Sequence, residues 1–511
     1  MIMLILLTGR TVCAQQVKMM MPKPNWYNLD LKTDSMFGIS MDRAYQELLK
    51  GKKPEKVIVA VIDGGMDAAH EDLKRVVWTN PKEIPGNGKD DDKNGYIDDV
   101  HGWNFMGSGK DDFEFDNDYI VLELRKYTAR FGEKDSSAIA KDDLPEYRKY
   151  ISQRKELTQK LEKLNKDIEN STRFFKDLEA VLKKIGKENP TLDDFNKLVP
   201  ANDAEAKIKQ FMIPVLGKNP DFRTYVNQAK TTLEDNRNKV QYNLNLQYDP
   251  RAKYANEYPP VKEGFYGNPN VYGTVAPAHG THVAGIVGAD RNNNTGISGV
   301  ADAVQIMPIR AIPDGYGLDI DQANSIRYAA DNGAKVINMS FGLNTLLDRK
   351  AVEEAVKYAL SKDILFIQAA GNGHENLDNT KRYPSREKKE DQDFVDAFIK
   401  VGASGFADNE QLAVPFSNYG KQTVDVFAPG LGINSTIPGN GYEAHSGTSM
   451  AAPIVAGLAA VIREYYPKLT AKQVKEIIVK SVVKRDALRD LCISGGVVNA
   501  FNAIQMAESY K

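Results

Sequence analysis

The sequence predicts an α/β fold in which a mainly parallel central sheet is interrupted by an inserted helical subdomain. Short apolar, β-branched runs bounded by glycine-rich turns alternate with helical stretches over residues 51–107 and 256–511. Such runs are typical of strands that are buried on both faces, and the helices between them allow parallel pairing. Between these two pieces, residues 108–255 have the charge and periodicity of surface helices instead.

Five apolar runs are expected to form the centre of the sheet. They are "KVIVAVID" (56–63), "VQIMPIRAI" (304–312), "AKVINMSFG" (334–342), "ILFIQAAGN" (364–372) and "AFIKVGAS" (397–404). The stretches 319–334 and 348–363 lie between consecutive runs. We expect both stretches to be the crossover helices that parallel strands require.

The insertion over 108–255 is predicted to contain a long amphipathic helix. Its apolar residues recur at steps of three, four and seven, which is typical of a coiled-coil-like seam. These residues are Leu157, Leu161, Leu164, Ile168, Phe175, Leu178, Leu182 and Ile185. Pro190 is expected to end the helix. A disordered charged linker is the alternative, but the regular seam favours an ordered helix.

Composition and charge exclude several classes of partner. The chain has 511 residues, of which 42% are hydrophobic and 27% are charged, and its formal net charge is −2. A balance this close to neutral offers no electrostatic surface for nucleic acid or for an anionic membrane. Beyond the N-terminus, the sequence contains no apolar run of the roughly 20 residues that a membrane span requires.

Residues 1–14, "MIMLILLTGRTVCA", are expected to be a secretory signal peptide. A short apolar core is followed by the small-residue end Val12-Cys13-Ala14, so cleavage is predicted after Ala14. A buried N-terminal helix is the alternative. Cleavage leaves Cys492 as the only thiol, so no disulfide is expected. Residues 15–50 then form an N-terminal segment ahead of the first α/β piece.

Ser449 is a candidate nucleophile at the start of a predicted buried helix. The stretch "GYEAHSGTSMAAPIVAGLAAVI" (441–462) has hydroxyls and small residues directly before its apolar run. Ser and Thr commonly cap helix N-termini, which is the alternative explanation. A Ser at the positive end of a helix, with small neighbours, is also accessible to a substrate. None of the six histidines follows Ser449, which excludes the order of an α/β-hydrolase triad.

Three upstream residues have the chemistry that a serine nucleophile requires. His279, in "APAHGTHVAGIVGA" (276–289), is a candidate general base with small neighbours. Asp63 ends an apolar run, where a carboxylate is costly unless it pairs, and it is suited to orient a histidine. Asn372 offers a side-chain amide to an oxyanion. A capping role for Asp63, a turn role for Asn372 and metal binding by His279 with His282 are the alternatives.

Five motifs, in this order along the chain, resemble those of the subtilisin-like serine proteases, the subtilases. They are "VIDGGMD", "HGTHVAG", "NMSFG", "AAGN" and "GTSMAAP". The resemblance covers about 51–107 and 256–505. It implies a three-layer subtilisin-like fold in which Asp63 orients His279, His279 acts as general base and acid, Ser449 is the nucleophile and Asn372 stabilises the oxyanion.

The resemblance also implies where an extended substrate binds. Two backbone edges are expected to bind it by strand addition, one formed by Ser340, Phe341 and Gly342 and the other by Gly315, Tyr316 and Gly317. Ala369, Ala370 and Gly371 would form the wall of the primary specificity pocket, and their small size favours a large apolar substrate side chain. The chain departs from the family's usual pattern in Gly64, in the long insertion, and in residues 15–50, which are too short for the usual inhibitory prodomain.

Structural calcium is expected at two places. The loop "DDDKNGYIDD" (90–99) spaces oxygen ligands at Asp90, Asp92, Asn94 and Asp98, as in the first part of a calcium loop. His101 stands where a glutamate closes an EF-hand, so the loop would be of another kind, and a solvated acidic turn is the alternative. The resemblance implies a second site at Asp72 and Asn293.

These observations predict a secreted or periplasmic serine endopeptidase. It would hydrolyse proteins or peptides through an acyl-enzyme, with no nucleic-acid partner and no integral membrane span. The helical insertion is expected to bind a protein partner, or to gate or recruit substrate. The alternatives are a catalytically silent scaffold protein with the same fold, and a peptide ligase of the subtilase type.

Overall fold

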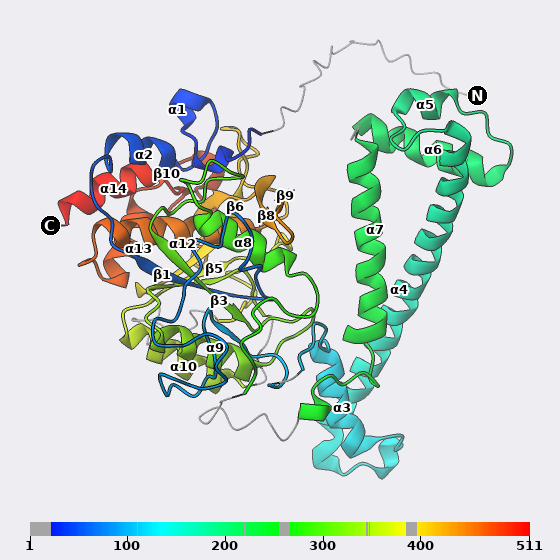
Figure 1. Cartoon of the computed structure of the whole chain (residues 1–511). Helices are drawn as coiled ribbons and strands as arrows, with labels where there is room; N and C mark the ends of the chain where they lie inside the picture. The colour runs from blue at the N-terminus through cyan, green and yellow to red at the C-terminus, as the bar shows by residue number, and fades with distance from the viewer. Residues whose placement is uncertain are drawn as a thin grey trace, which may run out of the picture.

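The computed structural model describes residues 22–109, 111–218, 221–254, 266–343, 346, 348–384 and 396–510. An α/β domain with a central sheet carries a long helical arm beside it (Figure 1). The predicted signal peptide over 1–14 lies outside the described residues. Among the described residues, no helix is both long enough and apolar enough to cross a membrane.

Over the described residues, the central sheet has nine strands, in the order β10-β11-β7-β6-β5-β4-β1-β3-β2. Their bounds are β1 Val57–Asp63, β2 Trp103–Asn104, β3 Val304–Arg310, β4 Val336–Met339, β5 Leu365–Ala369, β6 Phe398–Ser404, β7 Val426–Pro429, β10 Val483–Lys484 and β11 Gly496–Val497. All neighbours pair in parallel except β10 with β11. The five predicted apolar runs are β1, β3, β4, β5 and β6, so the prediction of a mainly parallel sheet is confirmed.

Helices cover both faces of the sheet and give the domain three layers. Alternate residues of β1 point to opposite faces, so Val59 and Val61 belong to one hydrophobic cluster and Ala60 and Ile62 to the other. The first cluster includes α8 (Ala278–Gly288), α12 (Thr448–Tyr465), α13 (Ala471–Lys480) and α14 (Ala500–Ser509). The second includes the predicted crossover helices, which are α9 (Asp319–Asp331) and α10 (Arg349–Ser361). The remaining elements are η6 (Asp486–Leu488) and a hairpin of β8 (Ile433–Ile437) and β9 (Gly441–His445).

The N-terminal segment is an integral part of this core. It contains η1 (Trp26–Asn28), α1 (Leu31–Asp34) and α2 (Met41–Glu47), and its side chains Trp26, Tyr27, Ile39 and Met41 are buried in the first cluster. The Tyr27 hydroxyl donates to the Ser298 carbonyl at 2.9 Å. Burial of this many large apolar side chains fastens the segment to the α/β domain.

The insertion forms the helical arm. Its elements are α3 (Tyr119–Phe131), η2 (Ser136–Ala138), η3 (Lys141–Asp143), α4 (Leu144–Ile185), α5 (Leu192–Lys197), α6 (Asp203–Lys218), α7 (Phe222–Asn238), the π-helical turn η4 (Lys239–Asn243) and η5 (Ala252–Tyr254). The 42-residue helix α4 runs alongside α7 (Figure 1). The predicted long helix is confirmed. Its end was predicted wrongly, because Gly186 terminates α4 in a left-handed conformation, ahead of Pro190.

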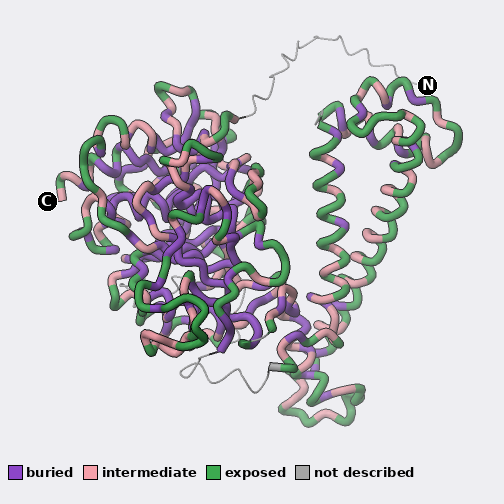
Figure 2. The backbone as a smooth tube through the Cα atoms, in the orientation of Figure 1, coloured by how far each residue is buried: buried purple, intermediate pink, exposed green. Residues whose placement is uncertain are grey.

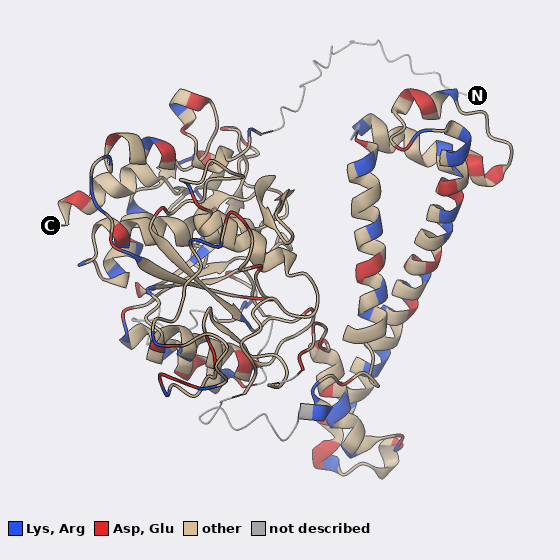
Figure 3. Ribbon diagram, viewed as in Figure 1, with Lys and Arg blue, Asp and Glu red and all other residues tan. Residues whose placement is uncertain are grey.

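Packing along the arm is concentrated at its two ends (Figure 2). At the root of the arm, one cluster joins α3 to the first part of α4 and includes Leu157. At the tip, a second cluster joins the last part of α4 to α5, α6 and the start of α7 and includes Leu178. Leu161 and Leu164, which lie between them along α4, are only partly buried. Acidic and basic residues are interspersed along the helices of the arm (Figure 3). Pairs one helical turn apart, such as Glu169 with Arg173, each add only a few tenths of a kcal/mol.

One buried carboxyl group near the C-terminal end of α12 makes stability depend on pH. The Glu464 side chain is fully buried and lies against the Asp302 carboxylate, whose oxygens accept hydrogen bonds from Tyr45 and Tyr465. Burial and then the Asp302 charge raise the pKa of Glu464 well above its ordinary value. Because the folded chain keeps this proton while the unfolded chain releases it, stability falls as pH rises from about 4.3 towards the raised pKa.

We expect Glu464→Gln to remove this contribution. The variant keeps a neutral side chain, so its free energy of unfolding should exceed that of the wild type by an amount that grows with pH, by up to about 1.4 kcal/mol per pH unit. Urea denaturation at a series of pH values between 5 and 8 measures the difference. The exposed Glu410→Gln is the matched control and should follow the wild type. Identical pH slopes for the wild type and Glu464→Gln would contradict the prediction.

Candidate active site

The predicted catalytic residues lie on segments at the carboxyl-terminal edge of the sheet. Asp63 is the last residue of β1, His279 is the second residue of α8, and Ser449 is the second residue of α12. Asn372 follows β5, which ends at Ala369. Open α/β sheets commonly bind their ligands at this edge, because the loops that follow parallel strands converge there.

Asp63 and His279 form a close pair. The His279 Nδ1 atom lies 2.8 Å from Asp63 Oδ1 and 3.0 Å from Oδ2, and the Gly64 backbone N–H also donates to Oδ1. This contact favours the tautomer with its proton on Nδ1 and leaves Nε2 as an acceptor. Burial acts to lower the pKa of His279, but the charge and hydrogen bond of Asp63 outweigh burial and raise the pKa. The side chain of Asp63 is buried, whereas that of His279 is 48% exposed and open to a reactant.

The approach of α8 to β1 depends on Gly280. A Cβ atom at this position would overlap the Gly65 carbonyl oxygen and would lie 3.1 Å from Asp63 Cβ. A larger residue would therefore push the start of α8, which carries His279, away from Asp63.

Ser449 is hydrogen bonded to the end of β4. Its hydroxyl donates to the Ser340 carbonyl at 3.0 Å, and the Ser340 hydroxyl donates back to the Ser449 carbonyl at 2.9 Å. Among the hydrogen bonds of the described residues, none joins Ser449 to His279.

Two N–H groups converge beside Gly447. The Asn372 Oδ1 atom accepts hydrogen bonds from the Thr448 N–H at 2.9 Å and from the Thr448 hydroxyl at 3.0 Å. Because Oδ1 faces Thr448, the Nδ2 atom of the same amide points away from Thr448. A Cβ atom on Gly447 would lie 3.4 Å from Asn372 Nδ2 and 3.7 Å from the Ser449 nitrogen. Within the described part of the chain, the Ser449 N–H donates to no protein acceptor, as expected for the first turn of a helix. This arrangement can donate two hydrogen bonds to one anionic oxygen.

The other predicted substrate residues border the same region. Ser340, Phe341 and Gly342 follow β4. Ala369 and Ala370 are buried at the end of β5, and the Gly371 N–H donates to the Thr448 hydroxyl at 2.9 Å. The segment with Gly315, Tyr316 and Gly317 follows β3, and Tyr316 is buried with its ring against that of Tyr119.

The acidic loop over 90–99 brings together only part of the predicted calcium ligands. Carboxylate oxygens of Asp90, Asp92 and the unpredicted Glu83 all lie within 4.8 Å of one another. Glu83 is 7% exposed, and its Oε2 atom is buried with no hydrogen-bond partner. The Asn94 Oδ1 atom accepts from the Tyr96 N–H, and both Asp98 oxygens accept from the N–H groups of residues 87 and 88. Asp98 therefore lies apart from the cluster.

The second predicted calcium site is satisfied by hydrogen bonds. Asp72 is buried, with one oxygen accepting from Asn293 Nδ2 at 2.6 Å and the other from the Ile297 N–H at 2.9 Å. A cation here requires the Asn293 amide to turn its oxygen towards Asp72.

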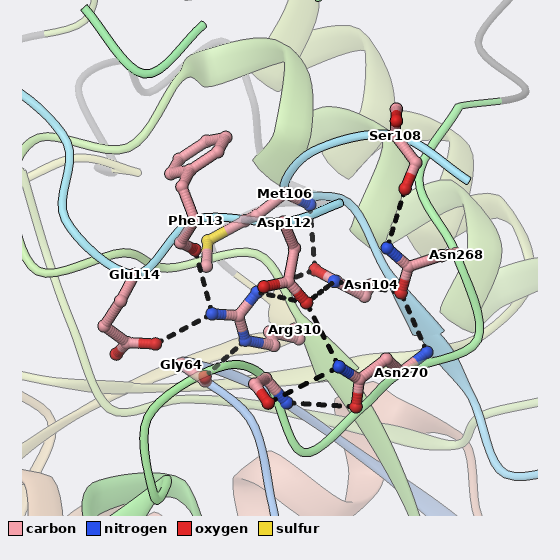
Figure 4. Close-up of polar contacts among 11 residues, drawn as sticks. Gly64, Asn104, Met106, Ser108, Asp112, Phe113, Glu114, Asn268, Asn270 and Arg310 are labelled. Carbon is pink, nitrogen blue, oxygen red and sulfur yellow. Dashed lines mark hydrogen bonds and ion pairs between the residues drawn. The ribbon is translucent and has the colours of Figure 1, made fainter. Parts of the chain in front are cut away.

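A buried arginine behind Asp63 connects the insertion to the active site (Figure 4). Arg310 lies opposite Asp63 in the pairing of β1 with β3 and is fully buried. Its guanidinium donates to the Gly64 carbonyl at 3.0 Å, to Asn104 Oδ1 at 3.1 Å, to the Phe113 carbonyl at 2.9 Å and to the Glu114 carboxylate at 2.8 Å. Arg310 therefore joins the residue after Asp63 to the first residues of the insertion.

The three-layer fold and this arrangement of side chains define an α/β protein with an Asp–His–Ser constellation at the edge of its sheet. The model of the subtilase family matches residues 55–495, and the chain belongs to that family.

Known relatives are similar over part of the chain. A thermophilic serine proteinase of Bacillus sp. (strain AK1) is 40% identical over 44% of this chain and 52% of its own length. Subtilisin DY of Bacillus licheniformis is 39% identical over 40% of this chain and 70% of its own, and thermitase of Thermoactinomyces vulgaris is 37% identical over 44% and 75%. The chain thus matches about half the length of the first of these relatives.

We expect Arg310→Met to destabilise the fold strongly. The change leaves the buried Asp112 carboxylate and the partly buried Glu114 carboxylate without their cation, which should lower the free energy of unfolding by about 3–5 kcal/mol. Urea denaturation measures the loss. The control is Arg75→Met, because Arg75 is largely exposed beside Asp290 and should cost at most about 1 kcal/mol. Equal losses in the two variants would show that the Arg310 cluster does not act as described.

Proposed function

We propose that the chain is a serine endopeptidase that hydrolyses peptide bonds of proteins or peptides through an acyl-enzyme intermediate. The observation that supports this most is the Asp63–His279 hydrogen bond, which lies at the sheet edge where Ser449 opens α12. The named relatives are proteinases, and the residue types and chain order match the family's motifs. A scaffold role alone would not require this set of polar side chains to be present together.

In the proposed reaction, the Ser449 hydroxyl turns from the Ser340 carbonyl to His279 Nε2. Its oxygen attacks the carbonyl carbon of the scissile peptide while His279 takes the proton, and Asp63 stabilises the imidazolium that forms. The developing oxyanion accepts hydrogen bonds from Asn372 Nδ2 and the Ser449 N–H beside Gly447. The C–N bond then breaks as His279 gives its proton to the leaving amine. Water repeats the sequence and releases the acid product from Ser449.

The bounds of the peptidase domain and the cellular location of the protein are part of the same proposal. Residues 51–107 and 256–511 would form the peptidase domain, with 108–255 as an insertion and 15–50 as an N-terminal segment. The signal-like pattern of residues 1–14 supports secretion or export to the periplasm.

A fluorophosphonate probe tests the nucleophile directly. We expect the folded wild-type chain to be labelled covalently and Ser449→Ala not to be labelled, because only an activated serine attacks the probe. Ser446→Ala is the matched control, since Ser446 lies three residues away and its hydroxyl accepts from the Gly432 N–H. Mass spectrometry of the labelled peptide gives the site.

Turnover of a peptide substrate by Asn372→Ala completes the test. Loss of this oxyanion donor should lower kcat on the order of 10²–10³-fold, a magnitude established for a subtilisin of the same family. A folded wild-type chain that is not labelled, or labelling that survives in Ser449→Ala, would overturn the proposed function.

We also propose that Glu83, Asp90 and Asp92 hold a structural calcium ion. Calcium prefers carboxylate and carbonyl oxygens, and the buried, unpartnered Glu83 oxygen beside two more carboxylates suits a cation. The ion would offset the repulsion among these charges and fix the loop that joins β1 to β2. It has no part in the proposed chemistry.

Calcium should therefore raise the thermal stability of the chain, and Glu83→Gln should remove most of that response. Calcium at about 100 times its Kd should add about 2.7 kcal/mol. Differential scanning calorimetry with calcium and with EDTA measures the shift in Tm. Asp98→Asn is the control, because Asp98 bonds to residues 87 and 88 and its loss should leave the calcium response intact. Equal calcium responses in the wild type and Glu83→Gln would refute the site.

A further inference from the structure

The insertion pairs with the back of a predicted substrate-binding edge. Residues 114–117, just ahead of α3, form a parallel bridge with residues 314–316. The Asp314 N–H donates to the Glu114 carbonyl at 2.9 Å, the Asp116 N–H donates to the Asp314 carbonyl at 2.8 Å, and the Tyr316 N–H donates to the Asn117 carbonyl at 3.1 Å. The insertion therefore occupies the backbone groups of Asp314 and the N–H of Tyr316.

The two glycines of the same segment are not part of this pairing. Gly315 and Gly317 both have positive φ, 144° and 68°, so the segment turns at the glycines and is not a regular strand. Within the described part of the chain, neither glycine exchanges a backbone hydrogen bond with a protein group. A Cβ atom on Gly315 would overlap the Asp116 carbonyl, so a glycine is required for the insertion to approach this closely. The segment therefore pairs with the insertion at Asp314 and Tyr316, and the backbone groups of Gly315 and Gly317, which have no partner among the described residues, form its free edge.

The second end of the arm fastens this pairing. Asn243, the last residue of η4, is buried, and its Nδ2 donates to the Asp314 carbonyl at 2.7 Å and to the Asp116 carbonyl at 2.8 Å. The Asp118 N–H donates to the Asn243 carbonyl at 2.8 Å. The carboxamide of Asn243, where the chain returns from the arm, is thus bonded both to Asp116, where the chain enters the arm, and to Asp314 in the segment that follows β3.

The root around Asn243 has further contacts of its own. The Asn117 carboxamide donates to the Tyr242 carbonyl at 3.0 Å, and the Tyr242 ring stacks on Phe115 with centroids 4.4 Å apart. The Arg251 guanidinium pairs with Asp116 and with Asp321 of α9 at 2.8 Å. Because these contacts also hold the root, loss of the Asn243 amide should loosen the 314–317 segment without detaching the arm.

We propose that Asn243 is a positioning residue for the substrate, and that the root of the arm holds the free edge of Gly315 and Gly317 in the shape that an extended polypeptide pairs with. This inference rests on the proposed protease function. It implies that the insertion favours substrates long enough to extend from the scissile bond along this edge. Small acyl groups that reach only Ser449 would gain nothing from the arm.

The test compares long and short reactants on the full-length chain. For Asn243→Ala we expect KM for an extended peptide of eight or more residues to rise about tenfold, with kcat nearly unchanged, because the loss of two hydrogen bonds loosens only the binding edge. The rate of labelling by a small fluorophosphonate should stay at the wild-type value. Asn238→Ala is the matched control, since this neighbouring amide makes no cap hydrogen bond, and it should leave KM unchanged.

A second variant guards against simple misfolding. Tyr119→Ala removes the ring that lies 5.5 Å from the Tyr316 ring on the outgoing side of the root, and it should raise KM for long peptides in the same selective way. Equal losses for long and short reactants in folded Asn243→Ala, or an unchanged KM for long peptides in both variants, would overturn the positioning role. A wild-type chain that the small probe does not label would instead overturn the proposed function.

Discussion

β1 and β3 lie side by side in the sheet with Asp63 opposite Arg310, although the whole helical insertion lies between them in the chain. Parallel neighbours must be joined by a crossover that leaves the carboxyl end of one strand and returns to the amino end of the next. Here that crossover also carries the arm. The chain therefore starts the insertion at the edge that holds Asp63, and the root of the arm lies behind the active site as a consequence of the strand order.

Arg310 makes this placement stable. A fully buried guanidinium is costly unless its donors are satisfied, and here they are shared between the loop after Asp63 and the first residues of the insertion. Burial raises the pKa of the Glu114 carboxyl, and the Arg310 charge opposes that rise. The same cation therefore compensates the Asp112 and Glu114 carboxylates of the insertion and supports the turn that follows Asp63. The turn after Asp63 and the start of the insertion are therefore held by the same set of hydrogen bonds.

The sequence was most informative where chemistry requires a particular residue beside small neighbours. The runs around Asp63 and Ser449 carried both a secondary-structure pattern and a motif, so the sheet and the pairing of Asp63 with His279 could be predicted. Glu83 was missed because it lies outside the regular spacing of the acidic loop, and only folding brings it to Asp90 and Asp92. Asn243 was missed because a single Asn at the end of a charged helix has no distinctive pattern. Its side chain donates to the backbone carbonyls of Asp116 and Asp314, and every residue has such a carbonyl, so the partners leave no signal in the sequence.

The length of α4 gives the arm mechanical leverage over its root. A helix of 42 residues extends about 63 Å, so a rotation of about 5° at the root moves the far end by about 5 Å. Conversely, a modest force applied at the tip exerts a large torque on the few hydrogen bonds around Asn243. The hydrophobic clusters at the two ends of the arm keep the tip and the root each compact, and α4 and α7 connect the two ends.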